Sequence, residues 1–310
     1  YLFRVPVAQF DPASVGGDAD PSVLNNVRFA RMLLTGFDQA ATIRFGTLDL
    51  VRSDWRKYGK NITANYTDPV LNPTFTDSEG TSIVQNDDFF VGSVNLEENG
   101  LNKPPYVLPP GIDRQILSGN SGAQRQNEAS LFMKATDLKV NDARGVFKNT
   151  TLDMRRYKNL KLFVHAEDLT GGNNTSSELD TNAKFFIRFG SDATDNYYEY
   201  EASLKYTPGN ATSPLDIWPD ENAVNLEIQN FVNLKLARDK IGNVIYENRF
   251  RDPEFGDDNK KIYIKGRPSL GNVTTIMLGV RNLTGTTTKP SKTKDLVLWV
   301  NEIRLSEIEN

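Results

Sequence analysis

The sequence predicts an all-β protein of the β-sandwich class, and three observations support this prediction. Many short runs alternate apolar and polar side chains with a period of two, which turns one face of a strand toward a core and the other toward water. Turn-forming clusters such as Gly171-Gly172-Asn173-Asn174 separate these runs. The mean hydropathy is −0.49, and no run of about 18 apolar residues, the length that spans a membrane, occurs.

Residues 1–58 are expected to be the C-terminal strands of a first β-sandwich whose earlier strands precede Tyr1. Their side-chain patterns predict three strands, at 3–7, 27–34 and 43–51. The same order of strands recurs near the other end of the chain, where Asn272-Val273 stands in the place of Asn26-Val27. Three strands alone would leave an apolar face and unpaired edges, so we expect the next segment to cover them.

Residues 59–124 are expected to form a long extended connector. Proline, glycine, asparagine and serine are dense there, and apolar residues come in small clumps. A structureless segment of this length is unusual inside a compact domain. We therefore predict that it lies along the sandwich surfaces, with one strand near 89–95.

Residues 125–309 are expected to form a complete β-sandwich. Residues 296–300 are apolar at both parities, which is typical of a central strand covered on both faces. The spacing of apolar residues between 226 and 240 allows a short helix on the rim. Glu199 and Glu201 fall on the face that alternation assigns to water. The opposite face, predicted to be core, carries Leu160, Leu162, Val164, Phe185, Ile187, Phe189, Tyr198, Tyr200, Ala202, Leu204 and Tyr206.

Composition excludes several classes of function. The chain has no cysteine, which removes disulfides, thiolate metal sites and cysteine nucleophiles. Its 36 lysine and arginine residues and 40 acidic residues give a net charge of −4 in a mixed pattern. Such a field does not attract polyphosphate, so nucleic acid is not an expected partner.

The sequence offers no catalytic constellation, and we expect no enzymatic activity. A serine nucleophile needs a base, and His165, the sole histidine, is interpreted as a structural residue at a strand end. Glycoside hydrolysis needs two carboxyl groups across a cleft. The candidate pairs are adjacent in sequence or lie on a face predicted to be solvated: Asp87-Asp88, Glu97-Glu98, and Glu199 with Glu201.

One acidic loop has side chains of the kind that Ca²⁺ prefers, namely carboxylate and amide oxygens. Its spacing fits no EF-hand, and it includes Arg251 and Lys260. We therefore expect no metal site and no cofactor, with a structural calcium ion as the alternative. The oxygen-bearing residues of this loop are Asp252, Glu254, Asp257, Asp258 and Asn259.

Exposed aromatic rings on a sandwich can stack on sugars. Alternation turns Tyr198 and Tyr200 inward, which leaves Tyr197 and Trp218 as the candidate exposed platforms. Packing in the core or at the rim is the competing interpretation of both residues. They are the only ligand-binding candidates that the sequence provides.

Several long blocks resemble the SprA family of gliding-motility proteins, the outer-membrane translocons of type IX secretion in Bacteroidetes. The blocks are ordered and spread over nearly the whole chain. They are 27–37, 43–45, 54–58, 92–99, 106–114, 127–131, 152–158 and 299–305. In addition, the Leu-Asp-x-x-x-Tyr-Lys-x-Leu stretch that begins at Leu152 resembles the opening of a core strand in galactose-binding-type jelly rolls.

The resemblance implies a non-catalytic soluble segment of a very large translocon that carries folded cargo across the outer membrane. Its partners would be other translocon subunits and secreted cargo proteins. The segment would plug or cap the secretion route, or it would dock partners. Membrane association would come only through other parts of the parent protein. The implied location is the cell envelope of a Gram-negative bacterium, at the outer membrane or cell surface.

Two other functions remain open at this point. A carbohydrate-binding or adhesive cell-surface module would need an exposed aromatic platform, for which Trp218 is the candidate to test. A glycoside hydrolase fragment would need a carboxylate pair about 5–10 Å apart in a groove.

Overall fold

The computed structural model divides into two compact units, residues 1–51 and 52–310. The three strands expected in residues 1–58 lie outside the described residues, and so does one copy of the repeated strand order. The second unit begins at Arg52. The structure describes residues 35–36, 38–39, 42, 55–63, 78–83, 88–114, 116–119, 122–125, 127–172, 174–241, 246–257, 259–283, 285 and 292–308.

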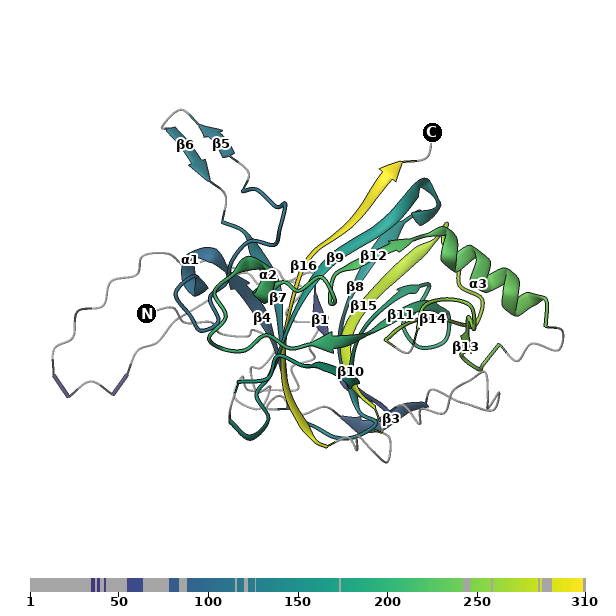
Figure 1. Cartoon of the computed structure of the whole chain (residues 1–310), viewed down its shortest axis with the longest axis horizontal. Coiled ribbons are helices and arrows are strands. Elements are labelled where there is room, and N and C mark those ends of the chain that lie inside the picture. The colour runs from purple at the N-terminus through teal and green to yellow at the C-terminus, as the bar shows by residue number, and fades with distance from the viewer. Residues whose placement is uncertain are drawn as a thin grey trace. The chain divides into compact units, whose positions relative to one another are not determined.

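A seven-stranded antiparallel sheet forms one layer of the second unit (Figure 1). Its strand order is β1-β8-β15-β10-β11-β14-β13, so that β15 and β10 lie at its centre. The bounds are β1 Arg56–Lys57, β8 Ala143–Leu152, β15 Val273–Asn282, β10 Leu179–Gly190, β11 Tyr197–Lys205, β14 Lys260–Lys265 and β13 Phe250–Arg251.

A five-stranded antiparallel sheet forms the other layer, in the order β12-β9-β16-β7-β4. Its bounds are β12 Val224–Glu227, β9 Tyr157–Asp168, β16 Lys294–Ile308, β7 Ala129–Leu138 and β4 Phe89–Asn95. Two separate hairpins pair β2 Lys60–Thr63 with β3 Ser78–Ile83, and β5 Ile116–Gly119 with β6 Gly122–Arg125.

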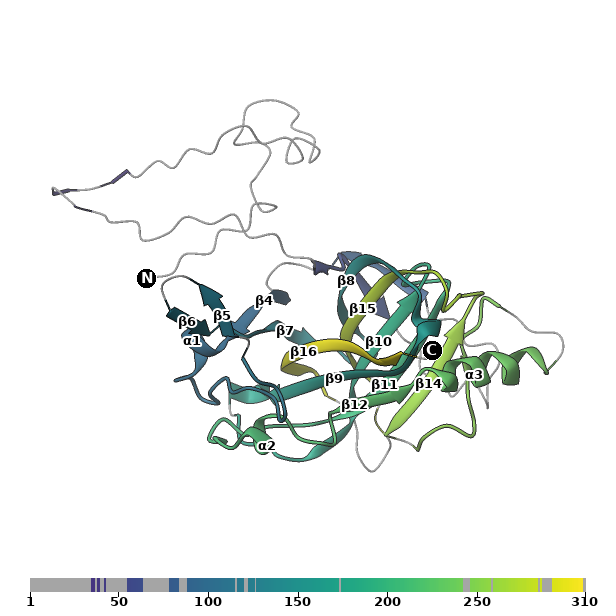
Figure 2. The same ribbon diagram turned by 90° about the horizontal axis from the view of Figure 1, so that it is seen from above.

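The helices are short and lie around the sheets. In Figure 2, α2 and α3 stand at opposite ends of the β9–β12 pair. Ser213 caps α2, because its hydroxyl accepts a hydrogen bond from the backbone N–H of Leu215. The bounds are α1 Leu96–Asn99, α2 Pro214–Ile217, α3 Gln229–Asp239, and the 3₁₀ turns Met154–Arg156 and Thr170–Gly172.

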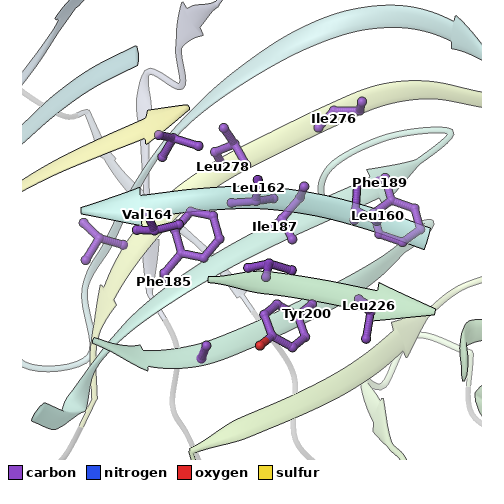
Figure 3. Packing of buried hydrophobic residues seen from close by; sticks show 14 of the residues in the cluster. Leu160, Leu162, Val164, Phe185, Ile187, Phe189, Tyr200, Leu226, Ile276 and Leu278 are labelled. Atoms are coloured by element: carbon purple, nitrogen blue, oxygen red, sulfur yellow. The ribbon is translucent and has the colours of Figure 1, made fainter. Parts of the chain in front are cut away.

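The main core lies between the two sheets (Figure 3). Alternate residues of β9 meet alternate residues of β10, so the period-two pattern of the sequence becomes the inner faces of both layers. All of the residues predicted for the core from 160 to 206 lie in this cluster. The labelled side chains are Leu160, Leu162, Val164, Phe185, Ile187, Phe189, Tyr200, Leu226, Ile276 and Leu278.

The two antiparallel sheets confirm the predicted all-β sandwich. The jelly-roll type and the predicted domain division stay predictions. β16 is central and apolar on both faces as expected, a helix occupies 229–239, and β4 lies at 89–95. Among the described residues, no helix has the length and apolar character needed to cross a membrane.

Both outer faces of the sandwich are also covered, which corrects one prediction. Glu199 and Glu201 were expected in water, yet they are 0% and 1% exposed. Ile62 of the β2–β3 hairpin packs with Phe186 and Met277 on the outer face of the seven-stranded sheet. A third layer therefore lies on a face that alternation alone assigns to solvent.

Candidate functional site

The outer face of the five-stranded sheet carries a row of residues directly opposite one another on four strands. Gly92 of β4 pairs with Phe132 of β7, Phe132 with Trp299 of β16, and Trp299 with His165 of β9. Their side chains point away from the main core, because the residues before and after them on β16 and β9 belong to that core. Phe132, Trp299 and His165 thus form an aromatic row across the sheet.

His165 is locked in this row. Its imidazole stacks on Trp299 with ring centroids 3.8 Å apart. Nδ1 donates to the carbonyl oxygen of Ile217 at 2.8 Å, and Nε2 lies 3.2 Å from Glu167 Oε1. The ring is 0% exposed, and both of its nitrogens are engaged. The imidazole therefore holds neighbouring groups of the fold through both of its nitrogens.

The loop that follows β4 is held over the aromatic row at two points. The hydroxyl of Tyr106 lies 2.8 Å from Ser130 Oγ and accepts a hydrogen bond from Asn301 Nδ2 at 3.0 Å. Trp218 Nε1 donates to the carbonyl oxygen of Val107 at 2.8 Å. Because Ser130 and Asn301 lie on β7 and β16, the loop is fastened to the sheet that it covers.

The loop begins at a compact cap. Asn95, just before α1, accepts a hydrogen bond from the backbone N–H of Glu98 at 2.9 Å. Its side-chain amide donates to Glu98 Oε2 at 2.9 Å, and its own N–H donates to Asn99 Oδ1 at 3.0 Å. This reciprocal arrangement resembles a capping box, and it fixes the direction in which the chain leaves β4.

A cavity of about 430 Å³ lies between this loop and the sheet. Phe132, Val297 and Trp299 line it from the sheet, and Phe90 of the edge strand lines its side. Phe90 is 52% exposed and packs edge to face against Phe132 at 5.9 Å. The volume and the mainly apolar lining are those of ligand pockets.

Polar residues also line the cavity: Ser93, Asn102 and Lys103 are exposed, whereas Glu167 is buried. Glu167 is 6% exposed, and its second carboxylate oxygen accepts a hydrogen bond from Asn174 Nδ2. Within the described part of the chain, Asn174 Oδ1 and Trp299 Nε1 are buried atoms without a hydrogen-bond partner. One is an acceptor and the other a donor, and both residues line the cavity.

On the opposite face of the sandwich, the outer side of the seven-stranded sheet holds a buried ion cluster. Glu199 accepts hydrogen bonds from Arg188 Nε at 2.5 Å and from Arg281 Nη1 at 3.2 Å. Arg249 binds the same carboxylate, and Arg281 also binds Glu201. Paired and hydrogen-bonded charges of this kind can be buried, whereas single ones cannot.

The electrostatics of Glu199 follow from this packing. Burial raises its pKa, but the positive charges of Arg249, Arg281 and Arg188 lower it more strongly, so the pKa of Glu199 lies below its ordinary value. Glu199 is therefore held as a carboxylate. The shift that a catalytic acid needs is in the opposite direction.

The two residues predicted as exposed platforms are buried, and the prediction that their rings are exposed is wrong. Tyr197 is 0% exposed, and the guanidinium of Arg188 lies 4.3 Å from its ring centroid. Trp218 is 1% exposed and packs edge to face on Tyr106. The structure places them on opposite outer faces of the sandwich, so they form no common site.

Two carboxylates of the acidic loop accept hydrogen bonds from the backbone of the same loop. Asp252 Oδ1 accepts from the N–H of Glu254, and Asp257 Oδ1 accepts from the N–H groups of Asn259 and Lys260. Asp258 lies outside the described residues. Across the ranges that the structure does describe, no three histidine or acidic side chains gather as metal ligands.

A second cavity, of about 550 Å³, lies beside α2, and polar and apolar groups line it about equally. Lys205 and Glu221, two of its charged groups, pair with each other at 2.6 Å. Its apolar lining includes Leu215, which is 62% exposed. The cavity over the five-stranded sheet is the better site, because it combines buried aromatic residues with polar atoms that lack partners.

A family model described as a motility related/secretion protein matches residues 1–310, the full length of the chain. The chain belongs to this SprA_N family. The match confirms the resemblance that the sequence blocks carry, and it indicates an envelope-associated protein of motility and secretion. A comparison with curated proteins finds no match.

Proposed function

We propose that this chain is a non-catalytic docking domain of an outer-membrane protein-secretion translocon, the type IX system that also serves gliding motility. The observation that carries this proposal is the cavity over the five-stranded sheet, together with the exposed apolar residues beside it. Its location would be the cell envelope, at the outer membrane or cell surface. Its partners would be other translocon subunits or secreted cargo, without nucleic acid and without a cofactor.

The surface around the cavity favours docking over plugging or capping. Phe90 is 52% exposed, and Leu101, in the turn that walls the cavity, is 99% exposed. Large apolar side chains beside a pocket with a buried aromatic floor are typical of protein-binding surfaces. A plug or a cap needs only bulk and shape, and would gain nothing from such a pocket.

The chemistry of the polar groups supports a non-catalytic role. Both nitrogens of His165 are engaged, and Glu199 and Glu201 are bound by arginine side chains. A general base must be within reach of a substrate proton. The buried carboxylates named here instead hold structural partners, so we assign the domain a role in contact rather than in bond-making.

The test replaces Phe90 and Leu101 with serine in the complete parent protein in its own bacterium. We expect reduced secretion and reduced gliding with an unchanged amount of the protein, because both residues are largely exposed and their loss spares the fold. The matched control replaces Leu236 and Ile241, which are 55% and 64% exposed in and just after α3. Normal secretion in the Phe90 and Leu101 variant, or an equal loss in the control, would contradict docking at this surface.

A further inference from the structure

We propose that the cavity over the five-stranded sheet binds one large apolar side chain, preferably aromatic, of an extended peptide segment, together with its adjoining backbone amide. The proposal rests on the docking function above and names the chemistry of the docked partner. The occupant is a segment of another protein, and the cavity receives a single residue of it.

The dimensions and lining of the cavity suit a side chain. About 430 Å³ is near the lower end of ligand pockets, which are roughly 300–1,000 Å³. The sheet supplies Phe132, Val297 and Trp299, and Phe90 and Leu169 add apolar contact. A large apolar group that leaves water for this site gains most of its binding free energy from the buried area.

The two atoms without partners indicate what accompanies the side chain. Trp299 is only 4% exposed, and its Nε1 donor has no acceptor among the described residues, while Asn174 Oδ1 has no donor there. A buried polar atom without a partner costs about 1–3 kcal/mol. A peptide group carries one carbonyl acceptor and one N–H donor on the same backbone. The backbone of an extended segment therefore carries both kinds of partner, and these reach the two buried atoms once the side chains around them move.

The orientation of the Asn174 amide is fixed by its neighbour, which strengthens this assignment. Asn174 Nδ2 donates to Glu167, a group that is acceptor-only when ionised, so Oδ1 points the other way. The remaining oxygen of Glu167 faces His165 Nε2. Glu167 thus orients Asn174 and leaves the amide oxygen as the acceptor for an incoming N–H.

A sugar fits the same cavity less well. Stacking on a sugar needs an open aromatic face, but the imidazole of His165 lies 3.8 Å from Trp299 and covers one face of that ring. Phe90 and Phe132 are turned edge to face toward each other, with an interplanar angle of 68°. The fully exposed Leu101 at the rim adds apolar surface, which suits a protein chain better than a glycan.

The test follows the indole N–H signals of the 310-residue chain by nuclear magnetic resonance. There are three tryptophans, so the spectrum has three such signals. The probe is N-acetyl-L-phenylalaninamide, with N-acetylglycinamide as the control that lacks a side chain and methyl β-D-galactopyranoside as the sugar. We expect the phenylalanine amide alone to shift the Trp299 signal saturably. Trp218 is the internal reference, because its Nε1 is bonded to Val107.

Variants decide where the probe binds. Phe90→Ala is expected to weaken binding about tenfold, the loss typical of a truncated interface anchor. Leu236→Ala, at a site of similar exposure, should bind as the parent chain does. Absence of a Trp299 shift, equal binding by Phe90→Ala, or a shift with the galactoside alone would overturn the proposal.

The two tests can fail separately. If secretion depends on Phe90 and Leu101 but the phenylalanine amide does not bind, docking stands and the occupant is not an extended peptide. If the amide binds at Trp299 while secretion is unaffected, the chemistry of the cavity stands and the docking function fails.

Discussion

Glu199 is bound by arginine side chains from three parts of the chain, and this determines what its replacement does. Arg188 comes from β10, Arg281 from β15, and Arg249 directly precedes β13. The carboxylate is 0% exposed, so water cannot replace it as a partner. Removing one member of such a cluster leaves buried charge without compensation.

We predict that Glu199→Gln lowers the free energy of unfolding by about 3–5 kcal/mol, the typical cost of breaking a buried pair. Urea unfolding followed by circular dichroism measures it. Glu227→Gln is the matched control, because Glu227 lies on an exposed position of β12. An effect of Glu199→Gln no larger than that of the control would show that the cluster does not stabilise the fold.

The same residues show where reading the sequence succeeds and fails. Period two places Tyr198 and Tyr200 in the core, and they lie there. It places Glu199 in water, which is wrong, because alternation separates two faces without revealing whether a distant segment covers the second. The available signal was Arg188 within the apolar run 185–189, since a charge there needs a partner.

At the scale of elements, β15 depends on a pair of glycines. Gly279 stands opposite Gly145 of β8 in the register. A Cβ on Gly279 would lie 2.3 Å from the carbonyl oxygen of Arg144 and 2.4 Å from the ring of Phe186. A Cβ on Gly145 would come no closer than 3.1 Å to its nearest neighbour. Gly145 therefore has more room for a side chain than Gly279, although the two residues are paired in the strand register.

We predict that Gly279→Ala destabilises the protein by about 1–3 kcal/mol, the usual cost of overpacking, because backbone and ring atoms must both move. Gly145→Ala should cost clearly less. Thermal unfolding of the two variants makes the comparison. Equal losses of stability in the two variants would mean that the close approach of Phe186 does not restrict which residue fits at position 279.

Elements were predictable where a local pattern decides them. β16 reads as central because residues 296–300 are apolar at both parities, and α3 follows from its apolar spacing. The cavity was not predictable. Its wall is a loop held by contacts of Tyr106 and Trp218 with residues far away in sequence. Only the neighbouring pair Phe89-Phe90 gave a hint, since one of two adjacent strand residues must face outward.

Across the second unit, a partly buried contact joins the two sheets. Asp180 at the start of β10 accepts from Lys294 Nζ of β16 at 2.5 Å and from the Tyr206 hydroxyl at 2.7 Å. Burial raises the pKa of Asp180, but the hydrogen bonds from Lys294 and Tyr206 outweigh it, so the pKa lies below its ordinary value. Burial also raises the pKa of Tyr206, which keeps the hydroxyl proton available for this contact.

We predict that stability falls as the pH drops below about 3.8, the ordinary value for an aspartate. The unfolded state binds the proton first, so the contribution of Asp180 is complete above that value and is lost as the pH falls through its lower folded value. Asp180→Asn should reduce this loss of stability at low pH. Asp220→Asn, at an exposed site, should leave it unchanged. Urea unfolding from pH 2 to 7 checks it. If Asp180→Asn lost as much stability at low pH as the parent chain, Asp180 would not be the source of this pH dependence.

The buried ion cluster also restricts how this sequence can diverge. Its two carboxylates and three guanidinium groups come from β10, β11, β15 and the residue before β13. A single substitution leaves an orphaned charge, while joint replacement by apolar residues of similar volume is often neutral or stabilising. Descendants of this chain would therefore keep all five side chains or exchange them together, and an intermediate lineage would pass through a less stable protein.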